Sequence, residues 1–262
     1  MISVTKTNNH NITNSKDLSI LVSMYGLSFM IYNQDTNEKK FFEYTFEAYN
    51  PSILQKKLQE ILDERTILQD AFKSIRFIHH NQLNTLVPES YFDPENFAVL
   101  LQQQVKLLPN DQINYDEIKA LHLYNIYVPY KNIAKSFTEN TQNIVHKHSA
   151  SEFLTAIMEE KKQAKNLPVF EIYLNIFPND FQIAVFKNEK LQLYNAFSFQ
   201  NIDEFLYYLF FIVETLEIKE TRAQFYIMGL DSTHKIVQNI KEFTQNIQVL
   251  KPKSPSQINN YL

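Results

Sequence analysis

Residues 170–199 read FEIYLNIFPNDFQIAVFKNEKLQLYNAFSF, and this stretch decides the fold. It contains three hydrophobic runs, 170–177, 181–187 and 191–199. Two short polar segments separate them, Pro178-Asn179-Asp180 and Asn188-Glu189-Lys190. Short segments rich in Pro, Asn and Asp are typical of turns between strands. The stretch therefore predicts three consecutive strands that run back and forth in one sheet.

A helix is expected directly after these strands. Asn201 is placed to cap it, Glu204 is placed to complete a capping box, and the helix runs to about Leu216. Hydrophobic periodicity then predicts, in order, a strand, a helix and a last strand: 224–228, 234–244 and 247–250. The second half of the chain is thus three strands, a helix, and further alternation of strand and helix.

The first half begins in the same order. We expect strands 18–24, 27–32 and 40–46, then a helix from Pro51 to about 65 and a strand 74–79. A loop bracketed by Pro88 and Pro94 follows, and after it a short helix 95–104, a strand 121–128 and a helix 131–138. The first half ends with a strand 143–148 and a helix capped by Ser149 or Ser151 that runs to about 163. Two tandem βββαβαβ units follow from this order. They predict an α/β fold with mixed sheets and helices on both faces.

We divide the chain accordingly. Residues 1–16 are expected to be a flexible arm, 17–166 a first subdomain with insertions, and 167–262 a second subdomain. The segment 163–168 is the expected linker.

This layout resembles the actin-like ATPase fold, a ribonuclease H-like architecture found in sugar kinases, heat-shock chaperones and pilus-assembly platforms. It most resembles a family of uncharacterised bacterial proteins, a domain of unknown function with that fold. The resemblance covers about residues 17–250 and rests on topology and pattern.

The nucleotide motifs of the resembled fold are degraded in this sequence. The first phosphate motif, an Asp and a glycine in the first hairpin, is here Ser23-Met24-Tyr25-Gly26 and has no carboxylate. In the second, Asn175 replaces the Asp, and Phe177-Pro178-Asn179 replaces the glycines. The adenosine turn, Met228-Gly229-Leu230-Asp231-Ser232, keeps one glycine.

These changes remove the groups that hold a nucleotide in the resembled fold, where the Asp residues bind Mg²⁺ through waters and glycine amides surround the phosphates. Asn175 is neutral, Pro178 has no amide proton, and Phe177 places a ring where phosphates would lie. Losing several such contacts, at about 1.5–3 kcal/mol each, predicts no ATP or Mg²⁺ cofactor. The chain is expected to be a pseudo-ATPase.

The low glycine content also argues against other kinds of phosphate-binding loop. The chain has only Gly26 and Gly229, whereas an average chain of this length carries about 18. A Walker loop or a glycine-rich dinucleotide turn is therefore excluded.

Few other side chains suggest chemistry. Asp180 and Asp231 are the carboxylates nearest the expected cleft, where they would bind a cation or act as a base; the alternative is a turn residue and a helix cap. Ser23 has no visible base. The residues of a vestigial cleft are therefore Ser23, Gly26, Asn175, Asp180, Gly229 and Asp231, with no catalytic residue assigned.

The histidines form two strand-end groups, His79-His80 and His146 with His148. A zinc site would need a third or fourth ligand, and none lies at a recognisable spacing. We expect these histidines to be structural, and we predict no metal site.

Composition excludes several classes of protein. Without cysteine, thiolate zinc sites and disulfides cannot form, which fits a cytoplasmic protein. A net charge of −4 gives no basic field for nucleic acid. No apolar signal segment is expected at the N-terminus. The longest apolar run, 205–213, is far shorter than the roughly 20 residues of a transmembrane helix.

That run, Phe205 to Val213, has two interpretations. It forms a helix for association with a partner or a second copy, or a helix packed between the sheet and the other subdomain. In the second case Tyr207 or Tyr208 would present a hydroxyl at the interface.

Two functional hypotheses follow. The first is a non-catalytic actin-like scaffold or protein-interaction module that binds an unknown protein or forms a homodimer. The alternative is a nucleotide- or small-ligand-binding sensor, or an enzyme, that uses an altered cleft between the subdomains.

Overall fold

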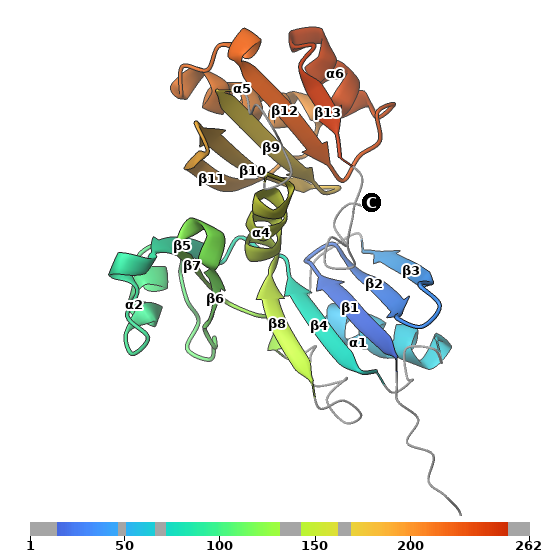
Figure 1. Ribbon diagram of the computed structural model, residues 1–262. Coiled ribbons are helices and arrows are strands. Elements are labelled where there is room, and N and C mark those ends of the chain that lie inside the picture. Colours follow the sequence, from blue (N-terminus) through green and yellow to red (C-terminus); the bar gives the residue numbers. More distant parts are fainter. Residues whose placement is uncertain (1–14, 47–50, 66–71, 132–142, 162–168, 251–262) are drawn as a thin grey trace, which may run out of the picture.

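The computed structural model describes residues 15–46, 51–65, 72–131, 143–161 and 169–250. The strands within these ranges form two five-stranded sheets and one three-stranded sheet, and helix α4 (Ser149–Lys161) lies between the large sheets (Figure 1). Most of the expected N-terminal arm, the expected linker and the expected helix 131–138 lies outside the described residues.

The first sheet has the predicted three-strand meander followed by parallel strands. Its elements are β1 (Lys16–Val22), β2 (Gly26–Asn33), β3 (Lys39–Thr45), α1 (Pro51–Glu64), β4 (Ser74–His79) and β8 (Ile144–His148). The order is β3-β2-β1-β4-β8, in which β1 pairs antiparallel with β2 and parallel with β4. Helix α1 packs on one face, where Leu58 contacts a core that includes Ile20 and Phe77.

The second sheet repeats this topology. Its elements are β9 (Phe170–Ile176), β10 (Asp180–Lys187), β11 (Lys190–Ser198), α5 (Ile202–Thr215), a 3₁₀ turn (Glu220–Arg222), β12 (Ala223–Met228), α6 (Lys235–Phe243) and β13 (Ile247–Val249). The order is β11-β10-β9-β12-β13. The predicted mixed α/β sheets are therefore confirmed.

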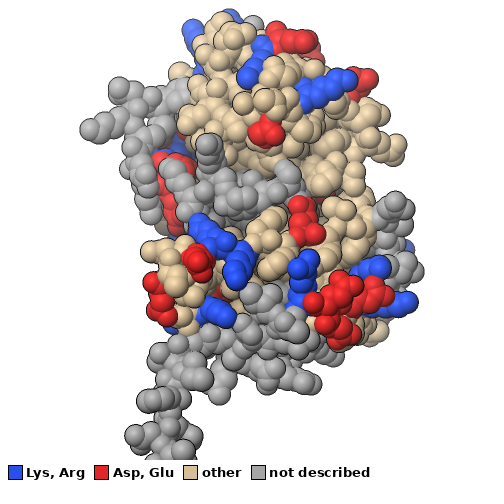
Figure 2. Space-filling view, turned by 90° about the vertical axis from the view of Figure 1, so that its right-hand side faces the viewer, with Lys and Arg blue, Asp and Glu red and all other residues tan. Residues whose placement is uncertain are grey.

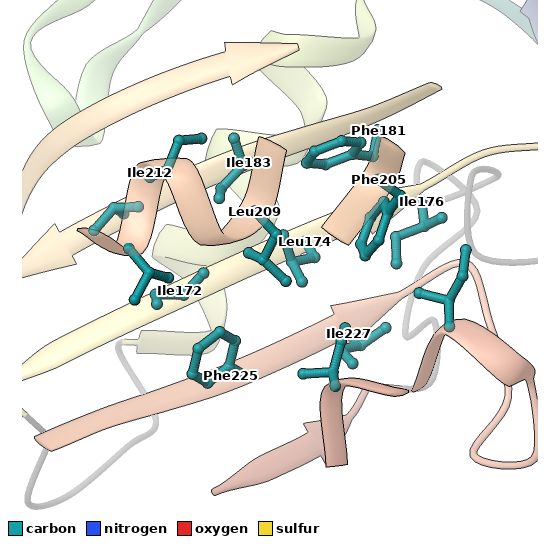
Figure 3. Close-up of a cluster of buried hydrophobic side chains, with 14 of the residues drawn as sticks. Ile172, Leu174, Ile176, Phe181, Ile183, Phe205, Leu209, Ile212, Phe225 and Ile227 are labelled. Atoms are coloured by element: carbon teal, nitrogen blue, oxygen red, sulfur yellow. The ribbon is translucent and has the colours of Figure 1, made fainter. Parts of the chain in front are cut away.

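Strand β9 is buried on both faces, which explains its continuous hydrophobic run. Leu174 and Ile176 point toward Phe205 and Leu209 of α5 in the core on one face (Figure 3). Tyr173 packs on the opposite face, in a cluster that includes residues of α4. The second sheet thus separates α4 from α5 and α6.

A third sheet, only partly predicted, is inserted in the first half. It consists of β5 (Asn84–Pro88), β7 (Leu123–Tyr127) and β6 (Asn114–Ile118), with 3₁₀ turns at Glu89–Tyr91 and Lys119–Leu121 and helix α2 (Phe97–Gln102). The sequence predicted β7 and a longer α2 but missed β5 and β6. Pro88 ends β5 and Asp116 lies in β6, and both residue types are depleted in strands.

Helix α5 begins as predicted, with a small change in its capping pattern. The Asn201 side chain accepts a hydrogen bond from the Glu204 amide at 2.9 Å. The Glu204 carboxylate accepts from the amide of Gln200, one residue before the cap, at 2.9 Å. Two backbone donors at the helix start are thereby satisfied.

The outer face of α5 is open to solvent. Tyr207 is 64% exposed and Phe211 is 54% exposed, while Phe205 and Leu209 are buried against the sheet. The interpretation of α5 as a helix enclosed between the sheet and the other subdomain is therefore wrong. The opposite face of this sheet contacts α4 instead.

Both glycines have a backbone reason for their identity. Gly229 has φ of 89°, a conformation that disfavours a side chain. At Gly26 a Cβ would lie 2.4 Å from the Tyr44 carbonyl oxygen of β3. Elsewhere the chain uses other residues at positive φ, including Asn188 and Glu189 in the β10–β11 turn.

Within the described part of the chain, no helix has both the length and the apolar character needed to cross a bilayer.

Candidate functional site

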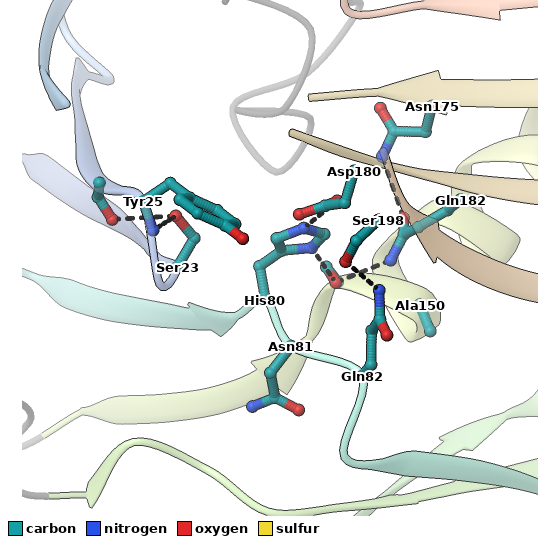
Figure 4. Close-up of polar contacts among 12 residues, drawn as sticks. Ser23, Tyr25, His80, Asn81, Gln82, Ala150, Asn175, Asp180, Gln182 and Ser198 are labelled. Atoms are coloured by element: carbon teal, nitrogen blue, oxygen red, sulfur yellow. Dashed lines mark hydrogen bonds and ion pairs between the residues drawn. The ribbon is translucent and has the colours of Figure 1, made fainter. Parts of the chain in front are cut away.

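The β1–β2 and β9–β10 hairpins meet between the two large sheets, as the two phosphate hairpins of the resembled fold would (Figure 4). Ser23 and Gly26 line one side of the cavity between them, and Phe177 and Asp180 line the other. The cavity has a volume of about 20 Å³. This volume holds about one water molecule, so a phosphate chain does not fit.

Phe177 occupies the space between the hairpins. Its side chain is 4% exposed and lies in a hydrophobic cluster with Leu21, Met30 and Ile78 of the first sheet. Its ring also stacks on His80, with the ring centroids 3.8 Å apart. A residue of the second half is therefore part of the core of the first half.

A hydrogen-bonded set of three side chains lies beside Phe177. His80, directly after β4, has Nε2 2.7 Å from Oδ1 of Asp180, the first residue of β10. Its Nδ1 is 2.8 Å from Oγ of Ser149, the first residue of α4. The three residues are buried and join both large sheets to the helix between them.

The set continues into the second sheet. The Gln182 amide donates to Ser149 Oγ at 2.8 Å, and the Asn175 amide donates to Gln182 Oε1 at 3.0 Å. With Gln182 as the donor to Ser149, the Ser149 hydroxyl donates to His80 Nδ1, and His80 Nε2–H donates to Asp180. Each of these protons then has an acceptor, whereas Asn175 Oδ1 is buried with no partner, as are the hydroxyls of Tyr127 and Tyr194 elsewhere among the described residues.

Serine, histidine and aspartate in this order are the groups of acyl-transfer enzymes. Ser149 is 0% exposed and its oxygen also accepts from Gln182, so a substrate carbonyl cannot reach it. The arrangement holds elements together and is unsuited to nucleophilic catalysis.

The sequence did not predict this set. Ser149 was expected only as a helix cap and His80 only at a strand end. The contacts span 69 residues from His80 to Ser149 and 100 residues to Asp180. No spacing motif in the sequence records such distant pairs.

The other predicted site residues have local roles. The Ser23 hydroxyl accepts from the Tyr25 amide and donates to the Gly26 carbonyl, both at 3.2 Å, within its own hairpin. Asp231 is exposed and accepts from the amide and hydroxyl of Thr233 at 2.7 and 2.5 Å, contacts that lower the pKa of its carboxyl group. Asp180 and Asp231 thus have separate partners and separate environments.

A larger pocket lies on the other side of Phe177. It has a volume of about 410 Å³ and lies between the β9–β10 hairpin, the Gly229 turn and the first residues of α5 and α6. Its lining includes Ile176, Phe199, Leu230 and Ile236, with polar groups from Asn201 and His234. The His234 ring accepts from the Ile236 amide at 3.2 Å and caps α6.

Two of the remaining strand-end histidines pair with each other, whereas His148 bonds to the Asn81 carbonyl and the Ala150 amide. His79 Nε2 lies 2.9 Å from His146 Nδ1, and the Tyr130 amide donates to His79 Nδ1 at 3.0 Å. His79 therefore carries its proton on Nε2 and donates it in a hydrogen bond to Nδ1 of His146. Burial lowers the pKa of His79 to about 3, and burial also lowers the pKa values of His146 and His148.

Among the described residues, no group of three or more His, Cys, Asp or Glu side chains is arranged to hold a metal ion. The groups that would hold ATP and Mg²⁺ in the actin-like fold are also a poor match. Asn175 is neutral and bonded to Gln182, and Pro178 offers no amide at the hairpin.

Comparison with solved structures shows the fold. A Bacteroides thetaiotaomicron protein with actin-like ATPase fold and unknown function is similar with a TM-score of 0.78 and 19% identity, covering 97% of this chain and 98% of that chain. A type IV pilus biogenesis complex, PilM-PilN, is similar with a TM-score of 0.60 and 10% identity, covering 90% of this chain and 88% of that chain.

Comparison with curated protein sequences finds no match. The family model described as "Protein of unknown function (DUF3822)" matches residues 5–247. The chain therefore belongs to this family and has the actin-like ATPase fold that the sequence pattern predicted.

Proposed function

We propose that this chain is a non-catalytic, actin-like protein-interaction module, a pseudo-ATPase whose phosphate position is occupied by its own side chains. The observation that carries the proposal is the position of Phe177, which stacks on His80 and packs on Leu21, Met30 and Ile78 between the two hairpins. Binding of a triphosphate there would require displacing this ring from a buried cluster. It would also expose the His80–Asp180 pair.

One of the similar structures supports an interaction role. The PilM-PilN structure is a complex, and forming such a complex is one use of the same fold. For this chain we infer an interaction role with a protein partner.

Charge and composition favour a protein partner over nucleic acid. The net charge is −4, and on the face shown in Figure 2 acidic and basic side chains are interspersed over the lower half. Such a surface lacks the single-signed basic field that nucleic-acid binding uses. The absence of cysteine is consistent with a location in the cytoplasm.

Isothermal titration with ATP and ADP in the presence of Mg²⁺ tests the proposal. We expect no heat of binding from the wild-type chain. Micromolar binding that is lost in Gly229→Trp, which would fill the turn beside the larger pocket, would overturn it. Circular dichroism of both proteins would confirm that each is folded.

The 410 Å³ pocket supports a second candidate function, the binding of a small ligand in an altered cleft. Its size and its mixture of apolar walls with a few polar groups are typical of small-molecule sites. Thermal-shift assays with a set of nucleosides and other phosphate-free heterocycles test this function. A ligand that stabilises the wild type but not Leu230→Trp would support it, and no stabilisation by any of them would count against it.

A further inference from the structure

The outer face of α5 carries exposed aromatic side chains between acidic ones. Asp203, Tyr207, Phe211 and Glu214 are exposed and lie at intervals of three or four along the helix, so they share one face. Tyr207 is 64% exposed and Phe211 is 54% exposed. We call these four residues the α5 stripe.

The aromatic part of the stripe is continuous with neighbouring rings. Tyr207 and Phe211 stack with centroids 6.2 Å apart, and Tyr207 contacts Tyr208 at 5.5 Å. Next to them, Phe210 packs at 4.5 Å on Phe243 of α6, which is itself 38% exposed. Exposed aromatic clusters of this kind are typical of the centre of protein interfaces.

The charges of α5 all have one sign. Residues 202–215 contain Asp203, Glu204 and Glu214 and no Lys or Arg. Glu214 lies in the last turn, where the helix dipole is negative and a carboxylate is unfavourable. A cation supplied by a partner would offset the unfavourable interaction between the Glu214 carboxylate and the helix dipole.

Charge decides between a second copy of the chain and a different partner. If two α5 stripes paired antiparallel, Asp203 of each would approach Glu214 of the other; if they paired parallel, each carboxylate would approach its own equivalent. Both arrangements bring like charges together across an apolar contact, which opposes association. A basic partner meets no such repulsion, and its Lys or Arg side chains also bind favourably over Tyr and Phe rings.

We propose that the α5 stripe binds an amphipathic helical segment of a partner protein, with apolar residues that cover Tyr207 and Phe211 and with Lys or Arg residues that meet Asp203 and Glu214. This proposal rests on the interaction role proposed above and names the surface and the class of partner. The helix-in-groove mode of recognition uses the same residue spacing.

Fluorescence anisotropy with two synthetic peptides tests the proposal. One is a labelled amphipathic helix with Leu on one face and Lys on its flanks, and the other replaces each Lys by Glu. We expect the Lys peptide to bind at least tenfold more tightly than the Glu peptide. We also expect its affinity to fall at least tenfold in Tyr207→Ser/Phe211→Ser and severalfold in Asp203→Asn/Glu214→Gln.

Tyr91→Ser is the matched control, because Tyr91 is 74% exposed and lies in the 3₁₀ turn after β5, outside α5. It should bind the Lys peptide as the wild type does. Since the substituted residues are exposed, the variants should remain folded, and circular dichroism verifies this.

Unchanged binding of the Lys peptide to Tyr207→Ser/Phe211→Ser, or equal binding of both peptides to the wild type, would overturn the proposal. So would sedimentation equilibrium that showed a wild-type dimer lost in the same double variant, because a second copy would then cover the stripe. Nucleotide titration remains independent of these results. Micromolar ATP binding would contradict the proposed function whichever peptide binds.

Discussion

The Nε2 atom of His80 lies 2.7 Å from Oδ1 of Asp180, so a side chain at the end of β4 is hydrogen-bonded to the first residue of β10 in the other large sheet. The Phe177 ring stacks on the same imidazole. The place where the resembled fold would hold phosphates is thus a packed contact between the two halves. Its contribution to stability can be measured.

The first prediction concerns the His80–Asp180 pair. His80→Gln and Asp180→Asn should each lower the free energy of unfolding by about 1.5–3 kcal/mol, because each leaves a buried hydrogen-bonding group with a poorer partner. The double variant should lose less than the sum of the two single losses, since both remove one interaction. Urea denaturation measures all three.

His122→Gln is the control for that experiment. His122 also pairs with a carboxylate, Glu89, but the two side chains are 82% and 56% exposed. Its substitution should cause no measurable loss. Equal losses of stability at His80 and His122 would mean that the buried pair contributes no more to stability than the exposed pair.

The second prediction concerns Phe177. Phe177→Ala should lower the free energy of unfolding by about 3–5 kcal/mol, because it leaves a cavity among Leu21, Met30 and Ile78. Phe211→Ala, at a phenylalanine that is 54% exposed, should have a much smaller effect. Thermal or urea unfolding compares them, and similar losses would contradict the packed contact.

The third prediction concerns Asn175, which is 2% exposed. Asn175→Asp should strongly destabilise the protein at neutral pH, because it places a carboxylate in a buried network without a cation. Burial should raise the pKa of the new carboxyl group in the folded state, so the folded state binds its proton more tightly than the unfolded state. The difference in stability between Asn175→Asp and the wild type should therefore shrink as pH falls from 7 toward 4.

Asn195→Asp is the matched control, since Asn195 is exposed on β11 and should tolerate the change. Unfolding should be measured with and without millimolar Mg²⁺. Recovery of Asn175→Asp by Mg²⁺ would indicate a working cation site and would contradict the proposed function.

The fourth prediction is a pH dependence from the buried histidines. Burial lowers the pKa of His79 to about 3, so between pH 6.5 and 3 the unfolded state binds a proton that the folded state does not. Stability should therefore fall as pH drops below 6.5, by about 1.4 kcal/mol per pH unit for each such histidine. His146 and His148, whose pKa values are also lowered, act in the same direction.

Urea titrations between pH 7.5 and 5.5 measure this slope. Burial raises the pKa values of Asp116 and Glu152, and these carboxyl groups make stability rise as pH falls in the acidic range. The titrations therefore stay above that range. His79→Gln should reduce the slope, while His122→Gln at an exposed site should leave it unchanged. A wild-type slope of zero would show that the histidines titrate normally in the folded protein.

Much of the fold could be predicted because it is encoded locally. The three strands of 170–199 follow from hydrophobic runs and turn residues that are neighbours in the chain, and Asn201 caps α5 by contacts within one helical turn. Strands β5 and β6 were missed because Pro88 and Asp116 are poor strand residues. Asp116 becomes acceptable only through its contacts with the His148 amide and Lys147, residues distant in the sequence.

The sequence by itself determined the order of strands and helices and the loss of the phosphate-binding groups at Ser23, Asn175 and Pro178, since residue type alone removes a charge or an amide proton. Residue type also predicted that the Phe177 ring lies where phosphates would bind, but only the tertiary structure decided what packs around that ring. It paired His80 with Asp180, 100 residues away, and placed Phe177 in the core of the other half. Side-chain packing depends on which surfaces the folded sheets bring together, and a local pattern does not specify those contacts.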